Sequence, residues 1–297
     1  MHDDEIDVDA ALVARLIEAQ FPEWAGLTIE PLLPWGTDNA LFRLGSDWIV
    51  RLPRIDWAVG QVEKDLRWLP VIAPRLPLAI PEPIVAGRPS DTYPWVWGVY
   101  RWLEGETLPA DRLGEARGTA NDLAGFLSAL RQIDTSAGPA AGPPNSSRGV
   151  PLGTRDEAVR AAVAELGDTV DNEAVTAIWE DALQASEWHD APTWLHGDLL
   201  PGNLLFVDGR LRAVIDFASL CVGDPACDLM VAWTFLTART RPELRVALDV
   251  DDDAWVRGRG WALSWALIAL PYYRETNPTL ASYAQRTLDE VLTDSVR

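Results

Sequence analysis

The chain changes its hydrophobic pattern near residue 103. Before that point, short runs of alternating or β-branched apolar residues predict strands. These runs cover residues 27–33, 40–44, 48–52 and 95–103. Polar turn segments at residues 35–39 and 45–47 separate the first three runs, so we expect an antiparallel meander.

Apolar residues with helical spacing dominate after residue 103. The predicted helices cover residues 119–133, 158–166, 173–188, 224–240, 255–270 and 279–292. Two more are expected earlier, over residues 8–21 and 57–72, and residues 74–83 form a proline-rich connection. Residues 135–152 are rich in Pro, Gly, Ala and Ser and predict an exposed loop. Strands followed by helices indicate an α+β fold, with a small antiparallel-sheet lobe over residues 1–103 and a larger helical lobe over residues 104–297.

Composition narrows the class of protein. The 297 residues are 48% hydrophobic and 24% charged, which is ordinary for a globular protein. Two cysteines, Cys221 and Cys227, do not make a disulfide framework, and no apolar run is long enough for a membrane span. The acidic residues 1–9 lack the order of a signal peptide, so we expect a cytoplasmic protein.

The net charge of −20 argues against nucleic acid and anionic membranes as partners. The same charge would favour a cationic small molecule. It is also a compositional bias that needs no ligand, and both interpretations stay open.

Candidate chemistry is concentrated in residues 194–217. Asp198 is followed by Asn203 five positions later, and Asp216 ends an apolar strand. Phosphoryl transfer needs one carboxylate to orient and deprotonate an attacking hydroxyl, and further oxygen ligands to hold Mg²⁺ against nucleotide phosphates. The pattern therefore predicts a kinase with Asp198 as catalytic base and with Asn203 and Asp216 as metal ligands.

Three motifs carry a resemblance to a known family. They are His-Gly-Asp-x-x-x-x-Asn at residues 196–203, Ile-Asp-Phe at 215–217 and Gly-Asp-Pro-x-x-Asp at 223–228. In order and spacing the chain resembles the aminoglycoside phosphotransferase family of small-molecule kinases, which includes macrolide phosphotransferases, over roughly residues 30–240. The resemblance implies a bilobal protein-kinase-like fold. Residues 1–103 would form the nucleotide-binding lobe ending in the hinge, and residues 104–297 would carry the catalytic loop and substrate pocket, with a nucleotide cleft between the lobes.

The resemblance also assigns roles to other residues of the three motifs. Asp228 would brace the catalytic loop, and Asp224 would shape the same corner. Independently of the resemblance, we expect His196 to fix the loop through hydrogen bonds. We expect these three to support the site structurally.

In the first lobe, Gly36 and Thr37 occupy the place of the loop that covers the nucleotide phosphates. Arg51 stands where kinases usually place a lysine that holds the α- and β-phosphates. Its expected helix partner is Glu63, with Asp65 as the alternative.

The hinge is expected at the end of the last strand of this lobe. There the backbone carbonyl of Arg101 and the backbone amide of Leu103 would face the purine, which leaves ATP and GTP equally open.

The tryptophans of the C-terminal part and an acidic cluster ahead of them each allow two interpretations. The tryptophans Trp233, Trp255, Trp261 and Trp265 either fill the core or line a large pocket. The acidic residues at positions 249–253 either cap the following helix or attract amino groups of a substrate.

The expected function is transfer of the γ-phosphate of ATP or GTP to a hydroxyl of an antibiotic such as an aminoglycoside or macrolide. The alternatives are a kinase of a housekeeping metabolite, such as an amino alcohol or sugar, and a nucleotide-binding protein without turnover. The acceptor and the oligomeric state stay open.

Overall fold

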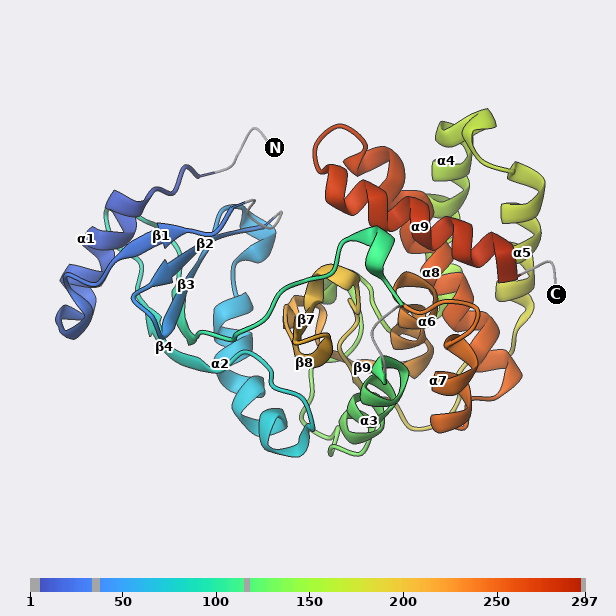
Figure 1. The fold of residues 1–297 in the computed structure, drawn as a ribbon, viewed down its shortest axis with the longest axis horizontal. Coiled ribbons are helices and arrows are strands. Elements are labelled where there is room, and N and C mark those ends of the chain that lie inside the picture. Colours follow the sequence, from blue (N-terminus) through green and yellow to red (C-terminus); the bar gives the residue numbers. More distant parts are fainter. Residues whose placement is uncertain (1–5, 34–37, 115–117, 295–297) are drawn as a thin grey trace. The chain divides into compact units, whose positions relative to one another are not determined.

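The computed structural model describes residues 6–33, 38–114 and 118–294. They form two compact units (Figure 1). The N-terminal unit comprises the residues up to 74 together with 79–104, and the helical unit comprises residues 75–78 and those from 105 onward.

The N-terminal unit is built on one antiparallel sheet with the strand order β1-β2-β3-β5-β4. Its strands are β1 (Ile29–Pro31), β2 (Asn39–Leu44), β3 (Trp48–Pro53), β4 (Pro83–Gly87) and β5 (Trp97–Arg101). The predicted meander of the first three strands is confirmed. The hydrophobic pattern did not predict β4, which begins with a proline and lies at the sheet edge, the position where a strand tolerates proline.

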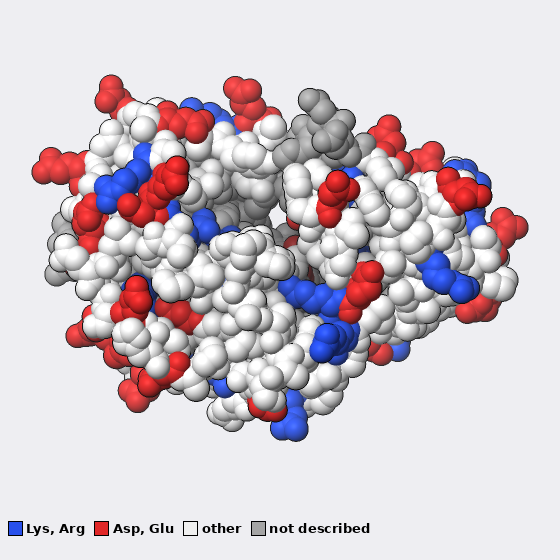
Figure 2. All heavy atoms as spheres, turned by 180° about the vertical axis from the view of Figure 1, so that it is seen from behind, with Lys and Arg blue, Asp and Glu red and all other residues white. Residues whose placement is uncertain are grey.

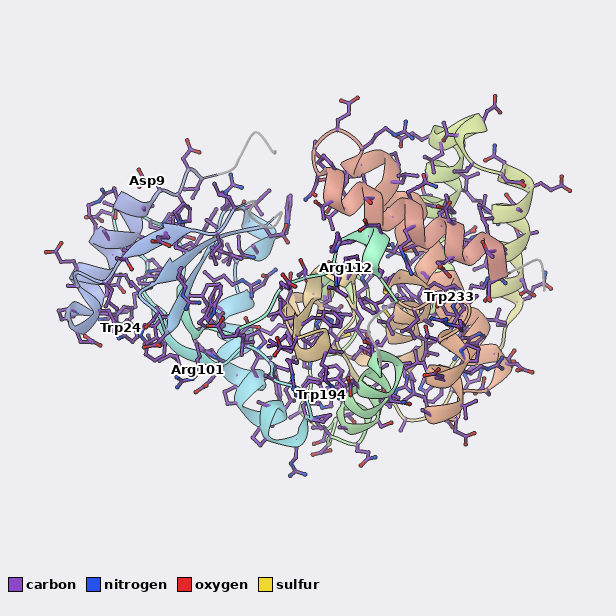
Figure 3. The ribbon with its side chains drawn as sticks, viewed as in Figure 1. Asp9, Trp24, Arg101, Arg112, Trp194 and Trp233 are labelled. Carbon is purple, nitrogen blue, oxygen red and sulfur yellow. The ribbon has the colours of Figure 1, made fainter. Side chains whose placement is uncertain are left out.

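Helix α1 (Ala10–Gln20) covers this sheet. It begins where the Asp9 side chain accepts a 2.7 Å hydrogen bond from the backbone amide of Leu12 (Figure 3). Its apolar face brings Ile17 into one buried core with the strand residues Phe42 and Val50. Helix α2 (Gln61–Ile72) follows β3 and packs beside β4.

The helical unit is organised around α8. Its helices are α3 (Thr119–Arg131), α4 (Asp156–Leu166), α5 (Asn172–Gln184), α6 (Val231–Thr234), α7 (Arg241–Ala247), α8 (Asp252–Tyr273) and α9 (Pro278–Asp294). Helix α8 is buried along most of its length and packs against α9, α4 and α5 (Figure 1).

The prediction of a continuous helix over residues 224–240 is wrong. The segment is the 3₁₀-helix Pro225–Met230 followed by the short α6. Helix α7 was not predicted from the hydrophobic pattern. Arg286 explains why α6 stops, because its guanidinium donates to the backbone carbonyls of residues 233–236. Those bonds satisfy carbonyls that a further helical turn would otherwise use.

Two small antiparallel pairs complete the unit, β6 (Thr193–Leu195) with β9 (Cys221–Gly223) and β7 (Leu204–Val207) with β8 (Arg210–Val214). The β7–β8 hairpin turns at Asp208 and Gly209, both at positive φ, which suits a tight two-residue turn. The pairs flank the predicted catalytic segments, residues 196–203 and 215–217.

The structure favours the structural interpretation of both open features. Trp233, Trp261 and Trp265 are buried, and the Trp233 indole N–H donates to Asp294 at 3.1 Å (Figure 3). Asp251 caps α8 by accepting a 2.7 Å hydrogen bond from the Ala254 amide. In the described part of the chain, no helix has the length and apolar character to cross a membrane.

Candidate active site

The loop after β6 places Asp198. Gly197 there has φ +82°, and a Cβ atom at this position would lie 2.8 Å from the Ser219 carbonyl oxygen, so only glycine fits. The buried Asp228 carboxylate accepts hydrogen bonds from the backbone amides of His196, at 2.8 Å, and Gly197, at 2.7 Å. Asp228 thereby fixes the backbone immediately before the predicted base.

His196 links this loop to the segment that carries Asp216. Its Nδ1 accepts from the Asp198 amide at 3.2 Å and its Nε2 lies 3.0 Å from the Ile215 carbonyl oxygen. This pattern fits a neutral ring that donates from Nε2. The ring is fully buried and packs edge-on against Phe217, with 4.6 Å between the ring centroids. His196 is thus a structural connection between the two predicted catalytic segments.

Asn203 and Asp216 are neighbours through the backbone, because the Ile215 amide donates to the Asn203 carbonyl at 2.9 Å. The Asn203 side-chain nitrogen donates to the Asp198 carbonyl at 2.9 Å and to Asp198 Oδ2 at 3.3 Å, which turns its amide oxygen away from the base. Asp216 has φ +63°, a conformation that aspartate and asparagine tolerate better than most residues.

This pair of oxygen donors fits Mg²⁺, which takes few protein ligands and completes its shell with water and phosphate. Among the described residues, no group of three or more His, Cys, Asp or Glu side chains is arranged to hold a metal ion.

The Asp198 carboxylate lies in a strongly perturbed environment. Burial raises its pKa to about 6, and the charge of Asp216 adds to the rise. Arg148 opposes both, since its Nη2 donates to Asp198 Oδ1 at 3.2 Å. About a quarter of the Asp198 side chain, 24%, stays accessible to solvent, so a reactant can reach the carboxylate.

Arg148 lies in a segment whose predicted exposure is wrong. Residues 135–152 are irregular, as expected, but Asn145 and Arg148 are buried, with 4% and 8% of their surface exposed. The Asn145 side chain donates to the carbonyls of Arg148, at 3.1 Å, and Ser219, at 3.3 Å. Polar composition predicted irregular backbone correctly but could not show that these polar groups bond one another inside the unit.

Asp224 supports the same region from the start of the 3₁₀-helix. Its Oδ1 accepts from the Ala226 amide at 2.9 Å and its Oδ2 accepts from Arg257 Nε at 3.0 Å. The adjacent Gly223 passes so close to Gly149 that a Cβ atom would lie 2.4 Å from the Gly149 carbonyl oxygen. Asp224 therefore anchors the end of β9 against the Arg148 segment.

In the N-terminal unit, Arg51 on β3 pairs with Asp65 rather than with the expected Glu63. Arg51 Nη1 lies 3.1 Å from Asp65 Oδ2, and Nη2 donates to Gln61. Gln61 and Asp65 are four residues apart and share one face of α2, whereas Glu63 is exposed on the opposite face. Tyr100 donates to the same Asp65 oxygen at 2.9 Å.

The remaining predicted nucleotide contacts are placed only in part. Gly36 and Thr37 lie outside the described residues. Arg101 is the last residue of β5, and its side chain is exposed and paired with Glu82 at 2.6 Å. Leu103 follows two residues later. A surface cavity of about 560 Å³, lined among others by Thr237, Arg239 and Arg286, lies beside α9 and includes none of the predicted site residues.

The model of the phosphotransferase enzyme family matches residues 30–261. The chain belongs to this family. The expected family is confirmed, and the protein is a phosphotransferase.

Solved structures share the fold of this phosphotransferase. APH(2″)-IIIa in complex with GDP and kanamycin has a TM-score of 0.72 and 20% identity, with 95% of this chain and 98% of the other covered. Macrolide 2′-phosphotransferase type I has a TM-score of 0.63 and 20% identity at the same coverage. The apoenzyme of macrolide 2′-phosphotransferase MphH from Brachybacterium faecium has a TM-score of 0.59 and 23% identity, again covering 95% and 98%. The expected protein-kinase-like α+β fold is confirmed.

Among curated proteins, a homoserine kinase from Rhodospirillum rubrum is 48% identical over 59 residues. That match spans 18% of this chain and 18% of the relative.

The raised pKa of Asp198 predicts how the phosphotransferase responds to pH. A general base must be deprotonated, so activity should be full above the pKa of about 6 and should fall about tenfold per pH unit below it. The acidic limb of kcat/KM for the free enzyme, measured with a stability control at each pH, checks this. A rate that stays constant through this region would contradict the assigned environment of Asp198.

Asp228 is expected to matter for stability more than for chemistry. An Asp228→Asn side chain keeps one acceptor oxygen but turns an NH₂ group toward the second of two buried amide donors. Leaving such a donor unsatisfied costs about 1–3 kcal/mol, so the Tm should fall by several degrees. Thermal unfolding followed by circular dichroism measures this, with the exposed Asp208→Asn as matched control. An unchanged Tm would show that the bonds to the loop contribute little.

Proposed function

We propose that the protein transfers the γ-phosphate of ATP or GTP to a hydroxyl group of a small molecule, with Asp198 as base. The arrangement of Asp198 and Asn203 carries this proposal. The Asn203 nitrogen bonds the base while its oxygen faces away, and the backbone bond from Ile215 places Asp216 next to it. One base and two oxygen ligands are thereby available within one small region.

In the proposed reaction, the acceptor hydroxyl donates a hydrogen bond to Asp198. As the oxygen–phosphorus bond forms, the bond from the γ-phosphorus to the nucleotide breaks, Asp198 takes the hydroxyl proton, and the nucleoside diphosphate leaves. Asn203 and Asp216 would hold Mg²⁺, which when bound neutralises charge on the phosphate oxygens.

Arg51 would supply further positive charge to the nucleotide phosphates. Asp65 and Gln61 hold its guanidinium in place, so it would bind in a preorganised orientation. Gly36 and Thr37 remain proposed phosphate contacts, and the backbones of Arg101 and Leu103 remain proposed purine contacts.

The nucleotide as donor is supported by structural neighbours that are complexes with GDP, ADP and ATP. Neighbours in complex with kanamycin, gentamicin and streptomycin support an antibiotic hydroxyl as acceptor. The local match to a homoserine kinase favours the second candidate, a hydroxyl of a housekeeping metabolite. The intact set of Asp198, Asn203 and Asp216 argues against a binding protein without turnover.

A coupled assay of nucleoside diphosphate release tests the proposal. ATP and GTP are each offered with aminoglycosides, macrolides, amino alcohols, sugars and hydroxy amino acids. We expect acceptor-dependent release that requires Mg²⁺ and that falls by about 100-fold or more in Asp198→Asn. Mg²⁺-dependent nucleotide binding without release for any acceptor would favour the binding protein instead.

A further inference from the structure

Arg148 is buried beside the proposed base with most of its hydrogen-bonding capacity unused. Its Nη2 bonds Asp198 Oδ1, while its Nε and Nη1 are buried and have no hydrogen-bond partner among the described residues. A buried guanidinium N–H without a partner is costly. Arg257 in the same unit instead bonds the Asp224 carboxylate through two nitrogens. The two spare nitrogens of Arg148 therefore point to an acceptor group that a ligand supplies.

A second arginine lies close to Arg148. Arg155 ends the 3₁₀-helix Leu152–Arg155, and its Nε donates to Ser264 of α8 at 2.5 Å. The guanidinium carbons of Arg148 and Arg155 lie 5.9 Å and 5.2 Å from the centroid of the Trp261 ring. Burial and the charge of Arg148 lower the pKa of Arg155 to about 10, so it stays protonated at neutral pH. Two positive charges thus share one aromatic ring.

The two oxygens of Asp198 face different groups, which separates the proposed acceptor site from the proposed metal and nucleotide site. Asp198 presents Oδ2 to Asn203, the proposed metal ligand, and Oδ1 to Arg148. On one side, the Arg148 guanidinium lies near the Trp261 ring, which Arg155 also approaches. On the other side, Asn203 accepts the hydrogen bond from the Ile215 amide, next to Asp216. An acceptor hydroxyl at Asp198 can therefore extend toward the arginines while the metal and phosphates lie toward Asn203.

We propose that Arg148 and Arg155 bind a carboxylate of the acceptor near the hydroxyl that is phosphorylated, so that the substrate is a hydroxy acid. The guanidinium groups suit this ligand, because arginine forms strong charge-assisted hydrogen bonds with carboxylates. Acidic side chains are scattered over the face in Figure 2, and the chain carries a net charge of −20, so an arginine that contacts the base and a second arginine on the same tryptophan ring are a local exception. The pair would repel a polycation. This inference rests on the proposed function, since it takes Asp198 as the base.

Matched acceptors test the inference in the diphosphate release assay. Glycolate, lactate, glycerate and gluconate are each compared with their primary amides, which keep the hydroxyl groups and remove the charge. A hydrogen bond to a charged group contributes about 1.5–3 kcal/mol, so kcat/KM for the best acid should exceed that of its amide by about tenfold or more.

Variants then assign the preference to these side chains. Arg155→Gln, which does not touch Asp198, should raise the KM for the acid by about tenfold and the amide's KM by much less. Arg160→Gln is the matched control, because Arg160 is an exposed arginine of α4 paired with Asp156 and Glu180. Equal values for acid and amide, or an equal rise for both in Arg155→Gln, would overturn the proposal.

Binding separates the two proposals. The Tm of the wild-type protein should rise with the acids and not with the amides, and Arg155→Gln should abolish that rise. Acids that stabilise the protein but are never phosphorylated would leave the carboxylate site standing and contradict the proposed function. Transfer to neutral or cationic acceptors alone would contradict the carboxylate site and support the proposed function.

Discussion

Replacing Asp198 with Asn is expected to lower kcat for phosphate transfer by about 10²–10⁴, the range that a positioned general base contributes. The amide has nearly the shape of the carboxylate, and its oxygen can still accept the hydrogen bond from Arg148. It cannot take up the proton of an attacking hydroxyl. The proposed nucleotide contacts are made by other residues, so the Kd of the Mg²⁺–nucleotide complex should change little.

Single-turnover rates and nucleotide titrations on the same preparation check both parts of this expectation. Asp208→Asn is the matched control, because it makes the same chemical change in the exposed turn of the neighbouring β7–β8 hairpin. Wild-type turnover in Asp198→Asn would assign the base elsewhere. Loss of nucleotide binding together with activity would instead indicate that Asp198 mainly maintains the structure.

The candidate site was readable from the sequence where its parts lie close together in the chain. Asp198 and Asn203 lie in the loop after β6, and Asp216 follows the β7–β8 hairpin that comes next, so their spacing carried the prediction. Arg148 lies 50 residues before Asp198. Its segment has no periodic pattern, and only the folded arrangement of Asn145 and its backbone partners brings it to the base.

The partner of Arg51 shows a second limit, which is register. The sequence offered Glu63 and Asp65 on one predicted helix without fixing which face meets the sheet. Apolar Val62 and Trp68 bury the same side of α2 as Asp65, and this places Glu63 in solvent. Helical spacing thus contained the answer, but only once the buried face was known.

The segment after β9 shows how tertiary contacts override local propensity. Its apolar residues favour a helix over residues 224–240, yet Asp228 is committed to the amides of His196 and Gly197, and Arg286 takes the carbonyls at the end of α6. These bonds come from distant parts of the chain. The segment therefore supports the predicted catalytic loop and does not form a regular helix.

Replacing Asp216 with Asn is expected to weaken the Mg²⁺ dependence of nucleotide binding by about 10–100-fold, since a charge-assisted interaction contributes about 1.5–3 kcal/mol. Asparagine is the appropriate replacement because residue 216 has φ +63°, where alanine would add backbone strain to the loss of the ligand. Calorimetric titration of nucleotide with and without Mg²⁺ measures the change. Asp208→Asn again serves as control, because Asp208 also has a positive φ, of 51°.

Asp216→Asn should have a second effect. Removing the Asp216 charge lowers the pKa of Asp198, so the acidic limb of residual activity should move to lower pH. An unchanged Mg²⁺ dependence together with an unmoved acidic limb would place the metal ligand at another residue.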